Sequence, residues 1–243
     1  MCAAIFILVS NKSIVHIKMT IINTVALNFS ESLSFYGSLG FDKKIVDGGA
    51  YVYDSSVVIF ISTKTSHRLG LSLMQPDWSS ELEAVRAYTE PVVVDDHFLV
   101  SDSSGIHIKL LPIQSQLPQS SKNSILGNFS GVSLEVVEFD RSKLIWEALG
   151  YQQSAGDANQ GWIVLSKEDN LSVGLIKAGA CPHIFTNPGL NYFNGTNNLD
   201  VIKKVRATGG SIAEEITAFS KTGEVDNVIL QDQAGLSFFL FSD

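Results

Sequence analysis

The chain has 243 residues, of which 45% are hydrophobic and 17% are charged, so two domains with a sizeable buried core are possible. This composition excludes a disordered chain. The net charge is -8 and the basic residues are scattered, which argues against nucleic-acid binding. Two distant cysteines, Cys2 and Cys181, are too few for a disulfide scaffold, so we expect a reducing, cytoplasmic setting.

The first residues are treated apart because they precede the pattern described below. Residues 1–9 (MCAAIFILV) are apolar but too short to span a bilayer, and no basic segment comes before them. We expect residues 1–18 to be an N-terminal extension or an added edge strand, and we expect no membrane association. A signal peptide is the alternative for this stretch.

The first half of the chain then carries clear helix signals. Asn28, with Glu31 three positions later, predicts a capping box, and Leu33, Tyr36 and Gly40 fall on one helical stripe. Gly40 suits the left-handed position that ends such a helix. The sequence therefore predicts a short helix that begins after residue 28 and stops at Gly40.

Strands and one further helix make up the rest of the first half. Strand-like runs at residues 51–53 and 57–61 precede residues 69–74, where leucines alternate with Gly, Ser and Met at the period of a strand. A helix is predicted at residues 79–88. The last strand follows residues 102–105, whose first Asp and last Gly suit a tight turn.

Residues 113–130 are rich in Ser, Gln and Asn and predict a linker to a similar second half. The first strand of that half is indicated by alternating apolar residues, and its first helix ends at Gly150. The further elements are strands at residues 161–165, 171–176 and 190–193, a helix at 199–208 and a strand after the turn 232–235.

Two sequence motifs of the first half recur in the second half, which shows that the halves are repeats. Residues 35–41 (FYGSLGF) return 110 residues later as residues 145–151 (IWEALGY), and the same offset aligns Ser32 with Ser142. Residues 102–110 (DSSGIHIKL) return as residues 232–240 (DQAGLSFFL). The halves thus share a beginning and an end, which indicates a tandem repeat.

These motifs resemble the glyoxalase/bleomycin-resistance/extradiol-dioxygenase (vicinal oxygen chelate) superfamily. That family's helix carries Ser, Phe-Tyr and Leu-Gly-Phe, and its last strand follows Asp-Pro-Asp-Gly; the counterparts here are Ser32, residues 35–41 and residues 102–105. The resemblance implies an α+β fold of four βαβββ modules paired into two glyoxalase-like domains with curved mixed or antiparallel sheets. The implied domains are 19–112 (modules 19–63 and 64–112) and 131–243 (modules 131–180 and 181–243).

The resemblance also implies where a metal would be held. Metal-binding members line the cup of each sheet with His from the first strand of a module and Glu from the last. The matching positions here are Ile21, Gly70, Lys109, Gly131, Asn191 and Phe239. None is His, Asp, Glu or Cys, and a lysine ammonium repels a divalent cation. We therefore expect no metal and no other cofactor at the family site.

Strand parity predicts the side chains that line the cups instead. The candidates in the first cup are Asn23, Ser72, Met74, His107 and Lys109. The candidates in the second cup are Ser133, Glu135, Trp162, Asn191 and Phe239. His107 and Lys109 side by side would suit a carboxylate or enolate oxygen; the alternative is that Lys109 extends to the rim and His107 is an ordinary strand residue.

The other titratable candidates carry less weight. Glu135 in an enclosed cup would act as a base, whereas a shift of one residue in register would place it on the outer face. His67 and His183 are expected in connecting loops, and His97 in a solvated turn beside two aspartates.

We therefore predict a glyoxalase- or bleomycin-resistance-like protein that binds a small aromatic or planar molecule in a cup without a metal. One alternative is a lyase or dioxygenase of the superfamily whose divalent metal is held by other residues. Another is an interaction protein with vestigial cups. The expected partner is a small molecule rather than nucleic acid or membrane, and the expected assembly is a monomer or homodimer.

Overall fold

The computed structural model describes residues 20–64, 66–102, 104–113, 117–168, 170–218, 220 and 223–242. The predicted extension at residues 1–18 lies outside these residues. None of the helices in the described part of the chain is long and apolar enough to cross a membrane.

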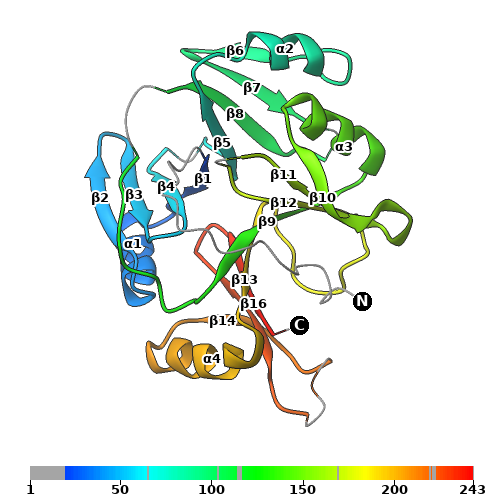
Figure 1. The fold of residues 1–243 in the computed structure, drawn as a ribbon. Coiled ribbons are helices and arrows are strands. Elements are labelled where there is room, and N and C mark those ends of the chain that lie inside the picture. Colours follow the sequence, from blue (N-terminus) through cyan, green and yellow to red (C-terminus); the bar gives the residue numbers. More distant parts are fainter. Residues whose placement is uncertain are drawn as a thin grey trace.

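The first half of the chain forms one mixed sheet of eight strands, which are β1 (Thr20–Val25), β2 (Asp42–Val46), β3 (Gly49–Tyr53), β4 (Val58–Ser62), β5 (Gly70–Gln75), β6 (Val92–Val94), β7 (His97–Ser101) and β8 (His107–Pro112) (Figure 1). Their order across the sheet is β2-β3-β4-β1-β5-β8-β7-β6. β1 runs parallel to β4 and β5 runs parallel to β8, while β1 and β5 join antiparallel at the centre. The sheet therefore consists of two paired βαβββ modules.

The second half repeats this arrangement with the strands β9 (Phe129–Val136), β10 (Gln152–Asp157), β11 (Trp162–Ser166), β12 (Val173–Lys177), β13 (Gly189–Phe193), β14 (Ile212–Ile216), β15 (Asn227–Gln231) and β16 (Ser237–Phe241). Their order is β10-β11-β12-β9-β13-β16-β15-β14, which matches the first sheet strand for strand. The predicted fold class, α+β with four βαβββ modules paired into two sheets, is confirmed. The division into domains at residues 112 and 131 stays a prediction.

Each module contributes one helix, and these are α1 (Phe29–Ser38), α2 (Ser79–Val85), α3 (Phe139–Ala148) and α4 (Asn198–Ala207). Two short 3-10 helices lie at Ala158–Gln160 and Gly195–Asn197. The predicted cap of α1 is confirmed, because Asn28 accepts a hydrogen bond from the Glu31 amide and donates one to the Glu31 carboxylate. Gly40 and Gly150 both have φ +88°, the left-handed conformation that glycine adopts most readily.

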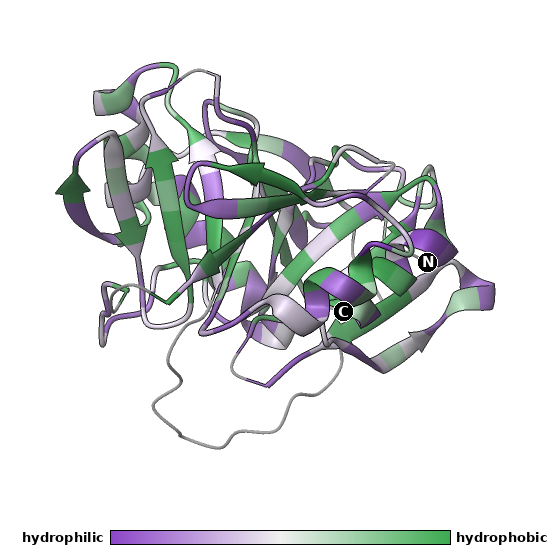
Figure 2. Cartoon of the chain, turned by 90° about the horizontal axis from the view of Figure 1, so that it is seen from above, coloured by the Kyte–Doolittle hydropathy of each residue, from purple (hydrophilic) through white to green (hydrophobic). Residues whose placement is uncertain are grey.

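The principal core lies on the helix-covered faces of both sheets and is continuous between them. It joins Ile22 of the first sheet and Leu134 of the second to the large side chains Tyr36 of α1 and Trp146 of α3, all fully buried. Figure 2 shows hydrophobic residues concentrated in the central strands, with hydrophilic residues toward loops and outer edges. The two sheets therefore share one interior.

Asp232 and Asp102 are the first residues of the two repeated turns, and each forms hydrogen bonds to the other half of the chain. The Asp232 carboxylate accepts hydrogen bonds from Tyr36 at 2.9 Å and from Thr24 at 2.8 Å, both in the first half. Asp102 in turn accepts one from Ser142 of α3 at 2.7 Å. The first module thus packs against the fourth, and the second against the third.

Several element predictions need correction. No ranges were predicted for β6, β7, β14 and β15, nor for β2 and β10, which are polar edge strands without the alternation that a half-buried strand shows. β9 begins at Phe129, inside the predicted linker, because Phe129 pairs with Tyr192 across an irregularity in the register. α2 ends at Val85 rather than residue 88, since the backbone continues in tight turns.

Candidate functional site

Successive residues of β1 point to opposite faces of the first sheet. Ile22 belongs to the principal core with Tyr36 of α1, whereas Ile21 packs in a separate cluster with Val58 and Met74. The face that carries Ile21 lies opposite the helices. We call this face the first cup, and the equivalent face of the second sheet the second cup.

One row of residues crosses the first cup from strand to strand. The register of β3, β4, β1, β5, β8 and β7 places in this row Tyr51, Phe60, Asn23, Gly70, His107 and Ser101. Two aromatic rings with centroids 5.2 Å apart stand toward one end, and the imidazole of His107 stands toward the other. Gly70 keeps the floor between them free of a side chain, since a Cβ there would lie 2.3 Å from the carbonyl oxygen of His107.

Lys109 lies in the next row, two residues along β8 from His107 and opposite Ser72 of β5. On the floor, the side-chain amide of Asn23 donates a hydrogen bond to the Ser72 hydroxyl at 2.8 Å. Asn23 and Ser72 are buried, whereas His107 and Lys109 are half-buried. The structure therefore brings these four predicted residues onto one face.

His67 adds a second imidazole beside the first cup. It lies in the loop before β5, and its Nδ1 is 2.9 Å from the hydroxyl of Ser62 at the end of β4. Burial lowers the pKa of His67, and the positive charges of Lys109, Lys64 and His97 lower it further. His67 and Lys109 are therefore close enough for their charges to interact.

The pKa values of His107 and Lys109 are also lowered. Burial lowers the pKa of His107, with smaller contributions in the same direction from Arg68 and Lys109. Burial also lowers the pKa of Lys109. Both imidazoles, His67 and His107, are then mainly neutral at pH 7, because their pKa values lie below the ordinary value for histidine.

The other end of the first cup is apolar. Met74, predicted as a cup residue, pairs with Leu111 of β8 and packs in the cluster that contains Ile21 and Val58. Leu117, from the segment between the two sheets, also packs against this cluster. The first cup thus has a polar part with half-buried basic side chains and an apolar part that includes Tyr51 and Phe60 and against which Leu117 packs.

The second cup has the same Asn–Ser hydrogen bond at its centre as the first. The side-chain amide of Asn191 donates to the hydroxyl of Ser133 at 2.9 Å, which repeats the pair of Asn23 and Ser72. Both residues are buried. The carboxylate of Glu135 accepts a hydrogen bond from the backbone amide of Gly179 at 2.8 Å, so it supports the turn after β12.

Phe185 occupies the apolar part of the second cup. It comes from the segment between β12 and β13, packs against Trp162 and Ile176, and its ring centroid lies 5.4 Å from that of Phe239. All five predicted residues of this cup, Ser133, Glu135, Trp162, Asn191 and Phe239, therefore share one face by strand register, and Phe185 packs against its apolar part.

Glu214 of β14 holds this segment in place. Its carboxylate accepts a hydrogen bond from the Ile184 amide at 2.7 Å and lies 2.8 Å from Nδ1 of His183. His183 thus lies in a connecting loop, as predicted, and its Nδ1 faces the Glu214 carboxylate.

The residues at the family's metal positions do not fit a divalent metal. In the first cup Ile21, Ser72 and Lys109 lie side by side on β1, β5 and β8, and Gly70 is two residues from Ser72. None of them is a ligand for such an ion. Across the described ranges, no group of three or more His, Cys, Asp or Glu side chains is arranged to hold a metal.

Several residues of the first cup were not predicted from the sequence. His97 is not in a solvated turn: it begins β7, pairs with Val94, and its side chain is 14% exposed. Tyr51 and Phe60 were recognised as strand residues but not as cup residues, although the spacing of Tyr51 and Tyr53 signals a shared face. His67 had no usable signal, because its place depends on the path of a loop.

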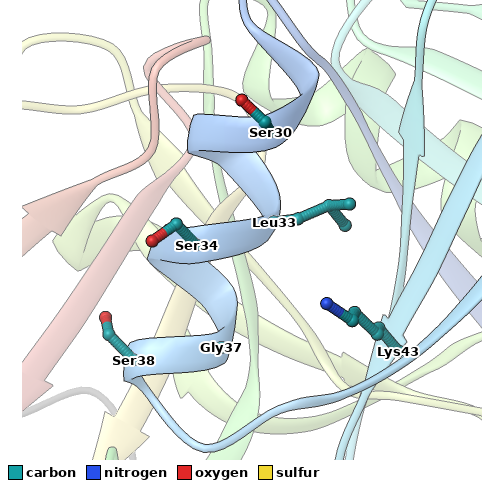
Figure 3. Close-up of a pocket in the computed structure, with 6 residues that line it drawn as sticks. All are labelled: Ser30, Leu33, Ser34, Gly37, Ser38 and Lys43. Carbon is teal, nitrogen blue, oxygen red and sulfur yellow. The ribbon is translucent and has the colours of Figure 1, made fainter.

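A hollow of about 600 Å³ lies outside both cups, along the outer side of α1 (Figure 3). Figure 3 shows Ser30, Ser34 and Ser38 along the helix, with the Lys43 side chain reaching toward Leu33 from the neighbouring strand. Most of its lining is exposed, and Lys43 is the one charged side chain there. We therefore place the candidate site in the first cup, where Asn23, Ser72, His107 and Lys109 share one face of the sheet.

The sequence matches no protein-family model and no curated protein. Solved structures do resemble the chain. The Mn(II)-bound glyoxalase from Novosphingobium aromaticivorans has a TM-score of 0.59 at 14% identity, covering 93% of this chain and 81% of that one. The 2,2',3-trihydroxybiphenyl 1,2-dioxygenase from Sphingomonas wittichii strain RW1 has a TM-score of 0.58 at 13% identity, covering 93% and 90%.

Homoprotocatechuate 2,3-dioxygenase from Arthrobacter globiformis gives a similar result, with a TM-score of 0.60 at 12% identity over 92% of this chain and 79% of that one. Identities this low establish the fold and nothing finer. The chain has the fold of the vicinal oxygen chelate superfamily, as its helix and turn motifs predict.

Proposed function

We propose that the protein binds a small planar or aromatic molecule in the first cup and that binding requires no divalent metal. The observation that carries this proposal is the row with Tyr51 and Phe60 toward one end and His107 toward the other. Phe60 and His107 lie three strands apart, which is about 14 Å along the sheet. A molecule of one or two rings with a polar substituent has the dimensions to contact both.

The surroundings of this row support the proposal. Half-buried aromatic rings offer large apolar contact area at little cost in conformational entropy, and a few polar groups at one end fix the orientation of a ligand. The first cup provides both. In the second cup Phe185 packs against the apolar part, and Ser237 and Phe239 stand in place of His107 and Lys109, so we assign binding to the first.

A ligand screen tests the proposal directly. Purified protein is mixed with a library of planar aromatic compounds, and binding is followed by thermal shift and tryptophan emission. We expect hits whose affinity falls at least about tenfold in Phe60→Ala, since truncating a contacted ring removes about 1.4 kcal/mol or more. Ile184→Ala, an exposed residue outside the first cup, is the matched control and keeps the affinity. No stabilisation by any library member would contradict the proposal.

A metal-dependent lyase or dioxygenase is the second candidate, favoured by the glyoxalase and dioxygenases whose fold the chain shares. Elemental analysis of the purified protein separates the two candidates. Stoichiometric Fe, Mn, Ni or Zn would favour the enzyme. The alternative of an interaction protein with vestigial cups is supported for the second cup alone, where Phe185 fills the apolar part.

A further inference from the structure

Lys109 and His107 lie on one face at the polar end of the first cup, although the chain as a whole has a net charge of -8. Lys109 makes no ion pair with any described residue, and the groups that influence His67 and His107 are Lys64, Lys109, His97 and Arg68. The nearby carboxylate of Asp96 is exposed and contacts His97 at 3.4 Å. The ammonium of Lys109 is half-buried, and a half-buried charge is stabilised when an anion pairs with it.

The second cup provides an internal comparison within the same chain. The repeat that aligns residues 102–110 with 232–240 places Ser237 where the first cup has His107, and Phe239 where it has Lys109. Ser237 is fully buried, and Phe239 packs against Phe185. Basic residues thus occur in the first cup and are replaced by Ser237 and Phe239 in the second, against which Phe185 packs.

We propose that Lys109, His107 and His67 form an oxyanion site in the first cup, which receives a carboxylate or enolate oxygen of a planar ligand. Lys109 supplies, at the family's metal position, the positive charge that a metal would otherwise bring. His107 and His67 donate hydrogen bonds to the oxyanion from β8 and from the loop before β5. This inference rests on the proposed function and narrows its ligand class to anions.

Proton uptake follows from the surroundings of the two imidazoles. Burial and the charges of Lys109, Lys64, Arg68 and His97 favour the neutral form of the imidazoles in the free protein. A bound carboxylate reverses the balance of charge and raises both pKa values. Binding therefore takes up protons near neutral pH, and affinity increases as the pH falls from 8 toward 6.

Matched ligand pairs test the inference. Benzoate and benzamide, 2-naphthoate and 2-naphthamide, and 4-hydroxybenzoate and 4-hydroxybenzamide are titrated calorimetrically at pH 7 in two buffers of different ionisation enthalpy. We expect each acid to bind more tightly than its amide and to take up protons. Lys109→Met lowers the affinity for the acids at least about tenfold, while Lys109→Arg retains most of it. The double variant His67→Gln/His107→Gln abolishes the proton uptake.

The outcomes separate this inference from the proposed function. Acids and amides that bind equally well, with no effect of Lys109→Met, would overturn the oxyanion site and leave planar-ligand binding intact. If no member of any pair and no compound of the aromatic library binds, both fail. Preference for the acids without proton uptake, unchanged in the histidine double variant, would overturn the role of the imidazoles. Circular dichroism of each variant confirms folding before titration.

Discussion

At the residue scale, Asp232 is a carboxylate buried between the two sheets. Burial raises its pKa, although hydrogen bonds from Thr24, Leu236, Tyr36 and Ala234 act in the opposite direction. Burial and the neighbouring Asp232 likewise raise the pKa of Tyr36 well above its ordinary range. A buried polar group is tolerated when its hydrogen bonds are satisfied and destabilising when one is removed.

Tyr36→Phe therefore removes a bond from a carboxylate that water cannot reach. We expect the free energy of unfolding to fall by about 1.5–3 kcal/mol, the usual loss for a hydrogen bond to a charged group. Urea denaturation measures the change. Tyr53→Phe, on a half-buried tyrosine of β3, is the matched control, and a comparable loss in that variant would contradict the explanation.

The two histidines of the first cup predict how stability depends on pH. The folded protein lowers the pKa of His67 and of His107, so the unfolded chain binds more protons once the pH falls below about 6.5. Stability should therefore decrease as the pH falls through 6.5 and level off below the folded pKa values. Melting temperatures between pH 5 and 8 test this, and His67→Gln/His107→Gln should flatten the curve. If the melting temperature of the double variant depends on pH as steeply as that of the wild type, the two histidines are not the cause of the pH dependence.

At the scale of elements, the segment between β12 and β13 closes the second cup. Phe185 is held there by Trp162, Ile176 and Phe239. We expect Phe185→Ala to destabilise the protein by about 1–3 kcal/mol, less than a fully buried phenylalanine, and to expose an apolar cavity. Binding of a hydrophobic fluorescent dye should increase. Ile184→Ala, one residue away but 40% exposed, should change neither stability nor dye binding. Similar behaviour of the two variants would contradict the role of Phe185 in closing the second cup.

The elements also show what the sequence can predict. The helix motif and the Asp-x-x-Gly turns predicted two repeated halves because these features are local: a cap, a left-handed glycine and a tight turn are decided by neighbouring residues. The four modules followed from the resemblance to the superfamily. Strand parity likewise predicted that Asn23 and Lys109 share a face. The place of Phe185 was not predictable, since it depends on which way a loop folds over a sheet. β2 was missed because a polar edge strand lacks the alternation of apolar residues.

At the scale of the whole molecule, the two sheets are tied together at two junctions. Asp232 bonds to Tyr36 and Thr24 at one junction, and Asp102 bonds to Ser142 at the other. The principal core runs through both sheets without a break. A molecule built in this way cannot lose one sheet without exposing the helix-covered face of the other, so the halves should unfold together.

Calorimetry tests this cooperativity. We expect a single thermal transition whose calorimetric and van 't Hoff enthalpies agree, with tryptophan emission and far-ultraviolet dichroism changing together. Ser142→Ala removes the bond to Asp102 and should shift the whole transition downward without splitting it. Because the two junctions are separate, its effect and that of Tyr36→Phe should add to within about 0.5 kcal/mol in the double variant. Two resolved transitions, or probes that disagree, would instead show that each sheet with its helices is an independent folding unit.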